Sequence, residues 1–149
     1  MRDAFPRPAF TADTVLVRDR ERGWEVLLVR RGNPPFQGLW ALPGGFVDAY
    51  EPPEDAARRE LEEETGIRFE GPLRLLGVFG GPGRDPRGWT VSAVYMGLVG
   101  PSDAAEPVAG DDAAEARWHR LDALPDLAFD HADVLASARG VLEAGSVHV

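Results

Sequence analysis

The stretch "RRELEEETG", residues 58–66, decides how the rest of the sequence is interpreted. Leu61 and two alanines upstream of it recur at helical spacing, and Gly66 is typical of the residue that follows a helix. These features predict a helix over residues 53–65, with a proline at its first position. Glutamates then crowd its last turn, where the helix dipole favours cations. Negative charge at the C-terminal end of the predicted helix therefore requires an explanation.

A bound divalent cation is one such reason. Residues three and four apart share a helix face, so Glu60, Glu63 and Glu64 can point at one spot. Mg²⁺ prefers oxygen ligands and is commonly held by one or two carboxylates together with substrate phosphates. The alternative is a solvated acidic helix whose charges pair with Arg58 and Arg59, and this run alone leaves that alternative open.

The residues around this run extend the pattern. Gly45 is followed after five residues by Glu51, and after seven more by the run over residues 59–67. This matches the Nudix box, G-x5-E-x7-R-E-U-x-E-E-x-G-U with U aliphatic, at every specified position. The chain therefore resembles the Nudix hydrolase family. The resemblance implies an α/β class, with the Nudix fold: an α/β/α sandwich around a mixed β-sheet.

The resemblance also implies roles for the residues of the box. Glu63 and Glu64 would be metal ligands, Glu60 a ligand or the general base, and the carbonyl of Gly45 a further ligand. Arg59 would orient the neighbouring carboxylates and belong to the catalytic set. The implied cofactor is Mg²⁺, with Mn²⁺ as the alternative, and the implied reaction is hydrolysis of a nucleoside diphosphate linked to another group.

The general base is not fixed by the box. Some Nudix enzymes use a box glutamate, here Glu60, and others use an acid from a loop before the final strand. The acids available in and beside that loop are Glu106, Asp111, Asp112 and Glu115.

The order of elements along the chain agrees with a mixed sheet covered by helices. A second helix is expected over residues 130–145, because its apolar residues recur at helical spacing. Strands are expected over residues 9–18, 24–31, 73–80, 89–100 and 115–121, with a short apolar piece at 39–46. No repeat or long linker divides the 149 residues, so a single domain over residues 1–149 is predicted.

Composition excludes several classes of protein. The sequence has no cysteine, which removes disulfides and thiolate chemistry and fits a reducing cytoplasm. A net charge of −9 argues against a broad basic face for nucleic acid. No apolar run reaches membrane-spanning length. The expected partner is a small nucleotide, with no nucleic acid and no membrane; the oligomeric state stays open, with a homodimer as one alternative.

Two segments outside the box bear on the substrate. Residues 33–48 and 82–95 look like the corresponding stretches of bacterial and archaeal ADP-ribose pyrophosphatases. If the substrate is ADP-ribose, the products are AMP and ribose 5-phosphate. The side chains expected to bind it are Arg30, Arg31, Arg84, Arg87 and Phe46. Alternative substrates are (d)NTPs, dinucleoside polyphosphates and NADH, and the alternative class is a nucleotide-binding sensor without hydrolysis.

Overall fold

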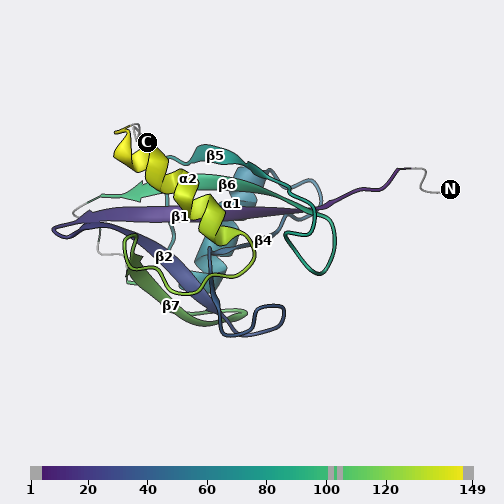
Figure 1. Ribbon diagram of the computed structural model, residues 1–149, viewed down its shortest axis with the longest axis horizontal. Helices are drawn as coiled ribbons and strands as arrows, with labels where there is room; N and C mark the ends of the chain where they lie inside the picture. Colours follow the sequence, from purple (N-terminus) through teal and green to yellow (C-terminus); the bar gives the residue numbers. More distant parts are fainter. Residues whose placement is uncertain (1–4, 101–102, 104–105, 146–149) are drawn as a thin grey trace.

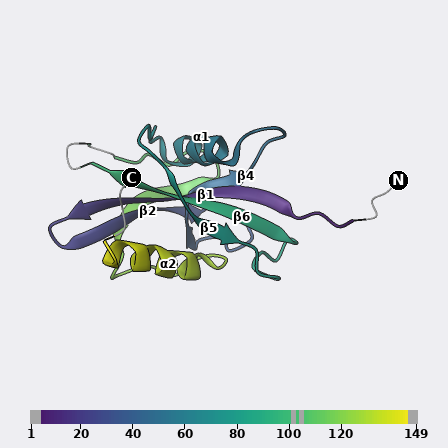
Figure 2. The same ribbon diagram turned by 90° about the horizontal axis from the view of Figure 1, so that it is seen from above.

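Three layers make up the molecule. The computed structural model describes residues 5–100, 103 and 106–145. Helix α1 (Pro53–Thr65) covers one face of a mixed β-sheet and helix α2 (His131–Glu143) covers the other (Figures 1 and 2). The predicted α/β/α sandwich is confirmed. Within the described residues, no helix is both long and apolar enough to span a membrane.

The sheet is built around one parallel pair of long strands. The strands are β1 (Ala9–Arg20), β2 (Gly23–Arg31), β3 (Trp40–Ala41), β4 (Gly44–Phe46), β5 (Arg74–Phe79), β6 (Thr90–Val99) and β7 (Ala113–Arg120). Their order is β3-β2-β1-β6-β5, with β4 paired to β1 and β7 paired to β2. The β1–β6 pair is parallel, and the other named pairs are antiparallel. The apolar piece expected over 39–46 is split into β3 and β4.

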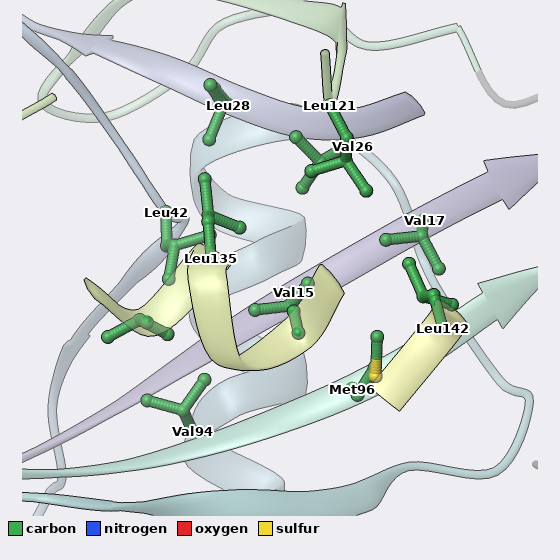
Figure 3. Close-up of a cluster of buried hydrophobic side chains, with 12 residues drawn as sticks. Val15, Val17, Val26, Leu28, Leu42, Val94, Met96, Leu121, Leu135 and Leu142 are labelled. Carbon is green, nitrogen blue, oxygen red and sulfur yellow. The ribbon is translucent and has the colours of Figure 1, made fainter. Parts of the chain in front are cut away.

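Strand β1 is apolar on both faces because both faces are covered. Val15 and Val17 belong to the core cluster under α2, whereas Leu16 packs with Leu61 of α1. Figure 3 shows the α2 side, where Leu135 and other helix residues meet side chains of β1, β2 and β6. A continuous apolar run is the expected pattern for a strand buried on both sides. The core therefore holds β1 at the centre of the sheet.

Helix α1 has the predicted bounds, and its acidic end is covered by another segment. Gly66 follows the helix in the left-handed conformation, with φ 72°. The last turn contains no basic residue. Instead, the backbone N–H of Val108 donates to the carbonyl of Thr65 at 2.8 Å, and that of Gly110 donates to the carbonyl of Glu64 at 3.1 Å. These contacts satisfy carbonyls that a helix end leaves unpaired, and they bring the loop before β7 to the end of α1.

Candidate metal and nucleotide site

A cavity of about 360 Å³ opens where α1, β1 and β4 meet the loop of residues 81–88 and the start of α2. Glu60 and Glu64 of the box line it. Among the residues that the structure describes, six carboxylates and three guanidinium groups face this cavity. An anionic substrate entering it therefore needs more positive charge than the arginines supply.

Two glycines allow carboxylates to lie directly against the backbone of β4. A Cβ atom at Gly45 would lie 2.6 Å from the Glu60 carboxyl carbon. At Gly44 it would lie 1.8 Å from Oδ1 of Asp13. The backbone N–H of Gly44 also donates to Oε1 of Glu64 at 3.0 Å. Any side chain at these positions would displace a carboxylate from the cavity wall.

Arg59 forms hydrogen bonds to several glutamates of the box. Its guanidinium group binds the Glu51 carboxylate through two hydrogen bonds of 2.9 and 3.0 Å. Its Nη1 also donates to Glu60 at 2.9 Å and to Glu63 at 3.1 Å. The hydrogen bonds from Arg59 lower the pKa of Glu51 to about 2. These contacts place Arg59 to orient Glu60 and Glu63, and its assignment to the catalytic set stays a prediction.

The electrostatics of the cavity favour a cation. Burial raises the pKa of Glu64 to about 8, with nearby Glu60 and Asp13 adding to the shift. Burial also raises the pKa of Glu60. Both shifts mean that contacts within the protein do not offset the cost of burying the ionised carboxylates. A hard divalent cation, which takes oxygen ligands, fits this set of donors.

Among the described residues, the side chains that would bind a metal ion do not form a compact cluster. Within the described part of the chain, no three acidic or histidine side chains already stand together as a metal site. Glu60 and Glu64 line the cavity, while the half-exposed Glu63 turns to Arg59. The residues that would hold the ion are Glu60, Glu63, Glu64 and the carbonyl of Gly45, and this set stays a prediction.

The structure separates the two arginines at the end of β2. Arg31 lines the cavity, and its Nε donates to the carbonyl of Pro35 at 2.6 Å. Arg30 lies outside the lining and pairs with Glu115 at 3.3 Å. Alternation along a strand sends neighbouring side chains to opposite faces. Of this pair, only Arg31 is placed to touch a ligand.

The two arginines of the 81–88 loop also differ. Arg84 is buried, and it binds both carboxylate oxygens of Asp130, at 2.9 and 2.7 Å. Arg87 is half-exposed and is held by Asp85, whose carboxylate accepts from its Nε at 3.1 Å and its Nη2 at 2.8 Å. Both arginines line the cavity, where Arg84 also anchors the loop to the start of α2 and Arg87 is the more exposed of the two, and their contact with substrate stays a prediction.

Aromatic rings form the rim of the cavity around Arg87. Its guanidinium carbon lies 5.4 Å from the ring centre of Phe46 and 5.6 Å from that of Phe129. Arg31 lies 5.0 Å from the same Phe129 ring. Phe129, in the left-handed conformation with φ 54°, was not predicted as a site residue. No sequence pattern indicates such a backbone conformation at a phenylalanine.

The loop acids fall into two groups. Asp112 lines the cavity, and Asp111 is close enough to raise the pKa of Glu60. Glu115 is bound to Arg30 and, at 2.6 Å, to Arg117. Glu106 lines a separate surface pocket next to residues 66–71. The structure thus brings Asp111 and Asp112 to the site and places Glu106 and Glu115 away from it.

Two buried polar residues on the inner wall were not among the predicted site residues. Asp13 lies on β1, and burial raises its pKa to about 7. His131 is the first residue of α2, and burial lowers its pKa to about 4. Asp13 shares its strand face with the core residues Val15 and Val17. An acidic residue at a core-facing position of a strand was therefore the sequence signal that could have identified it.

Comparison with known proteins agrees with this geometry. The family model of the NUDIX domain matches residues 8–138. The chain is 43% identical to the ADP-ribose pyrophosphatase of Methanocaldococcus jannaschii, over 88% of this chain and 73% of that protein. It is 37% identical to the ADPR responsive transcriptional repressor NtrR of Acinetobacter baylyi, over 90% of this chain but only 54% of the repressor.

A solved structure gives the same result. The NUDIX domain of Shewanella oneidensis NrtR complexed with ADP ribose superposes with a TM-score of 0.84 at 34% identity, covering 93% of this chain and 91% of that one. The chain therefore belongs to the Nudix family, as the box over residues 45–67 predicted. Within that family it is a Nudix pyrophosphohydrolase.

Proposed function

We propose that this chain hydrolyses ADP-ribose to AMP and ribose 5-phosphate with Mg²⁺ as its cofactor. The observation that carries the proposal is one cavity that joins the box carboxylates Glu60 and Glu64 to an arginine and aromatic rim. Support also comes from the name of the Methanocaldococcus relative and from the ADP-ribose complex of the Shewanella domain.

The rim suits the diphosphate and the adenine of such a substrate. Arg31 and Arg87 supply planar donors that match phosphate oxygens. Phe46 and Phe129 supply faces on which an adenine ring can stack. These contacts hold the diphosphate against the box, where binding in the reactive orientation lowers the barrier.

The box carboxylates supply the hydrolytic end of the site. When bound, a magnesium ion neutralises diphosphate charge and lowers the pKa of a coordinated water. Arg59 keeps Glu60 and Glu63 in place through its two hydrogen bonds. The base that takes the proton from water is proposed to be Glu60, Asp111 or Asp112, because Glu60 and Asp112 line the cavity and the charge of Asp111 is close enough to raise the pKa of Glu60.

The base is identified by comparing single-turnover rates of Glu60→Gln, Asp111→Asn and Asp112→Asn with the wild type. The residue whose replacement lowers the rate most at saturating substrate is the base, with a loss of about 100-fold or more expected. Glu106→Gln, remote from the cavity, is the matched control and should retain the wild-type rate. Equally mild losses in all three variants would remove each of them from this role.

A substrate panel tests the proposed function. The purified chain is given Mg²⁺ with ADP-ribose, a dNTP, a dinucleoside polyphosphate or NADH, and AMP and phosphate release are followed. We expect kcat/KM to be at least about 10-fold higher for ADP-ribose than for the others, a difference of about 1.4 kcal/mol. A larger kcat/KM for another compound would replace ADP-ribose as the substrate.

The sensor alternative predicts a different result in the same assay. It is favoured by the match to the Acinetobacter repressor, of which this chain spans about half the length. A sensor would bind ADP-ribose in a titration and release no AMP at any Mg²⁺ or Mn²⁺ concentration. We place it second because a site that only binds has no need for so many carboxylates on one helix.

A further inference from the structure

Asp13 and His131 form a polar pair on the inner wall of the cavity, outside the Nudix box. Asp13 is 6% exposed and His131 is 5% exposed, yet both side chains line the cavity. Buried polar groups are normally hydrogen-bonded, because leaving them unpaired costs free energy. The partners of this pair therefore indicate what the cavity is built to hold.

The orientation of His131 follows from its backbone contact. The N–H of Leu42 donates to Nδ1 of His131 at 3.0 Å, so Nδ1 carries the lone pair. The neutral ring then has its proton on Nε2, on the side of Asp13. The distance from Nε2 to Oδ2 of Asp13 is 4.0 Å, which is too long for a direct hydrogen bond. A single oxygen atom between them could accept from His131 and donate to Asp13.

The other neighbours of Asp13 leave acceptor capacity free. Its carboxylate receives a hydrogen bond from the Ser92 hydroxyl. Ser92 in turn accepts from Nη1 of Arg84 at 2.7 Å, while Nε and Nη2 of Arg84 bind Asp130. Arg84 is thus linked to Asp13 by two successive hydrogen bonds through the Ser92 hydroxyl. The carboxyl group of Asp13 has two oxygens, and the hydrogen bond from Ser92 uses one acceptor position, so donors from a ligand can be added.

The position of Asp13 limits which part of a substrate can bind it. The backbone of Gly44 contacts the Asp13 carboxylate and, through its N–H, the Glu64 carboxylate, so Asp13 lies next to the box carboxylates against which the proposed function places the diphosphate. A phosphate oxygen is anionic and has no proton to donate, so a carboxylate repels it. The adenine amino group is a donor but is separated from the diphosphate by the whole ribose. A sugar hydroxyl is both a donor and close to the phosphates.

We propose that Asp13 and His131 bind a hydroxyl group of a ribose attached to the diphosphate, with Asp13 as acceptor and His131 as donor. The pair then selects diphosphates that carry a hydroxylated sugar over those that do not. This inference rests on the proposed function and adds a specificity-determining pair to it. Either of the two riboses in ADP-ribose offers the required chemistry.

The experiment compares wild type and Asp13→Asn on three substrates with Mg²⁺. These are ADP-ribose, an ADP ester with an unhydroxylated alkyl chain in place of the terminal ribose, and an ADP-ribose whose adenosine sugar lacks both hydroxyls. Asn is isosteric but replaces one acceptor oxygen with a donor. We expect KM for ADP-ribose to rise about 10- to 100-fold with a smaller change in kcat. The analogue lacking the bound hydroxyl should lose less than about 2-fold in KM, and it identifies the sugar.

Equal losses on all three substrates would assign Asp13 a structural role and overturn the proposal, as would no loss on any. Asp133→Asn, an exposed acid in the first turn of α2, is the matched control and should match the wild type. If Asp13→Asn does not fold, the wild type decides: one analogue must have a KM at least 10-fold above that of ADP-ribose. If the wild type does not hydrolyse ADP-ribose, the proposed function itself is overturned. If the wild type does hydrolyse it, the comparisons above test only the role of Asp13 and His131.

Discussion

Two helix ends lie at the cavity, and negative charge is stabilised differently at each of them. The last turn of α1 carries Glu63 and Glu64 against the helix dipole, with no basic residue in that turn. The start of α2 carries Asp130, whose charge agrees with the dipole and is bound by Arg84 through two hydrogen bonds. The first arrangement is unfavourable in the protein alone, and the second is favourable.

The difference separates a site built for a ligand from a site built for stability. At α2, Asp130 has a protein partner of opposite sign in Arg84, so this ion pair needs nothing else. At α1, burial raises the pKa of Glu64, and the hydrogen bond from the Gly44 N–H offsets this shift only in part. Unfavourable charge that is retained at a cavity is a recognised property of functional sites. The comparison predicts that mutations at the two ends affect different quantities.

Glu64→Gln should have the largest effect, and on activity alone. The variant loses a carboxylate ligand, so we expect kcat for ADP-ribose to fall about 1,000-fold, equivalent to about 4 kcal/mol of transition-state stabilisation. The metal-free variant should have the same melting temperature as the wild type or a higher one, since the cost of burying an ionisable carboxyl, which raises the pKa of Glu64, has been removed. Steady-state kinetics and thermal unfolding in EDTA measure the two quantities.

Its matched control is Glu62→Gln. Glu62 is exposed on the same helix and does not line the cavity, and the same chemical change there should leave kcat unaltered. A Glu64→Gln enzyme with wild-type kcat at saturating substrate would remove Glu64 from the metal site.

Arg84→Ala should show the opposite behaviour at the α2 end. Removing the guanidinium leaves Asp130 without its partner, so we expect the free energy of unfolding to fall by about 3 kcal/mol. Urea denaturation measures this loss. Arg139→Ala, which removes a surface ion pair of 4.0 Å to Glu143 on the same helix, should cost less than about 0.5 kcal/mol. Similar losses in the two variants would mean that Arg84 does not anchor the loop.

His131 should make stability depend on pH. Its folded pKa of about 4 lies below the usual 6.5, so the unfolded chain binds more protons between these values. The contribution is fully present above pH 6.5 and is lost as pH falls towards 4, by roughly 3 kcal/mol. His131→Asn, whose side-chain oxygen can accept from Leu42, should flatten this part of the pH–stability curve. Curves for the two proteins that stay parallel from pH 7 to pH 4 would contradict this assignment.

Arg87→Ala should have the smallest effect and should change KM. Arg87 is half-exposed and held over Phe46 and Phe129, and its backbone N–H still donates to the buried Asp85 carboxylate after the substitution, so we expect a smaller loss of unfolding free energy than for Arg84→Ala. We expect KM for ADP-ribose to rise about 10-fold, and to rise less for a substrate without the second ribose. Arg120→Ala, a surface pair with Asp122, is the control. Equal losses on both substrates would give Arg87 a structural role.

The sequence predicted the local features of this molecule well. The bounds of α1 follow from Pro53 and Gly66, and the box residues are close in sequence, so their proximity is a property of one helix and one preceding turn. Asp13 and Ser92 could not be brought together in this way, because the register of two distant strands joins them. Nor could Phe129, whose place on the rim depends on a rare backbone conformation.

The parallel pairing of β1 with β6 also has a kinetic consequence. It joins residues such as Thr11 and Ser92, which are 81 positions apart, and contacts of such long range slow folding. A nascent chain that has emerged only as far as residue 80 contains the complete box and α1 but lacks the strand that completes the cavity wall. We therefore expect nucleotide binding to appear late in refolding, after most helical structure, when β6 docks beside β1.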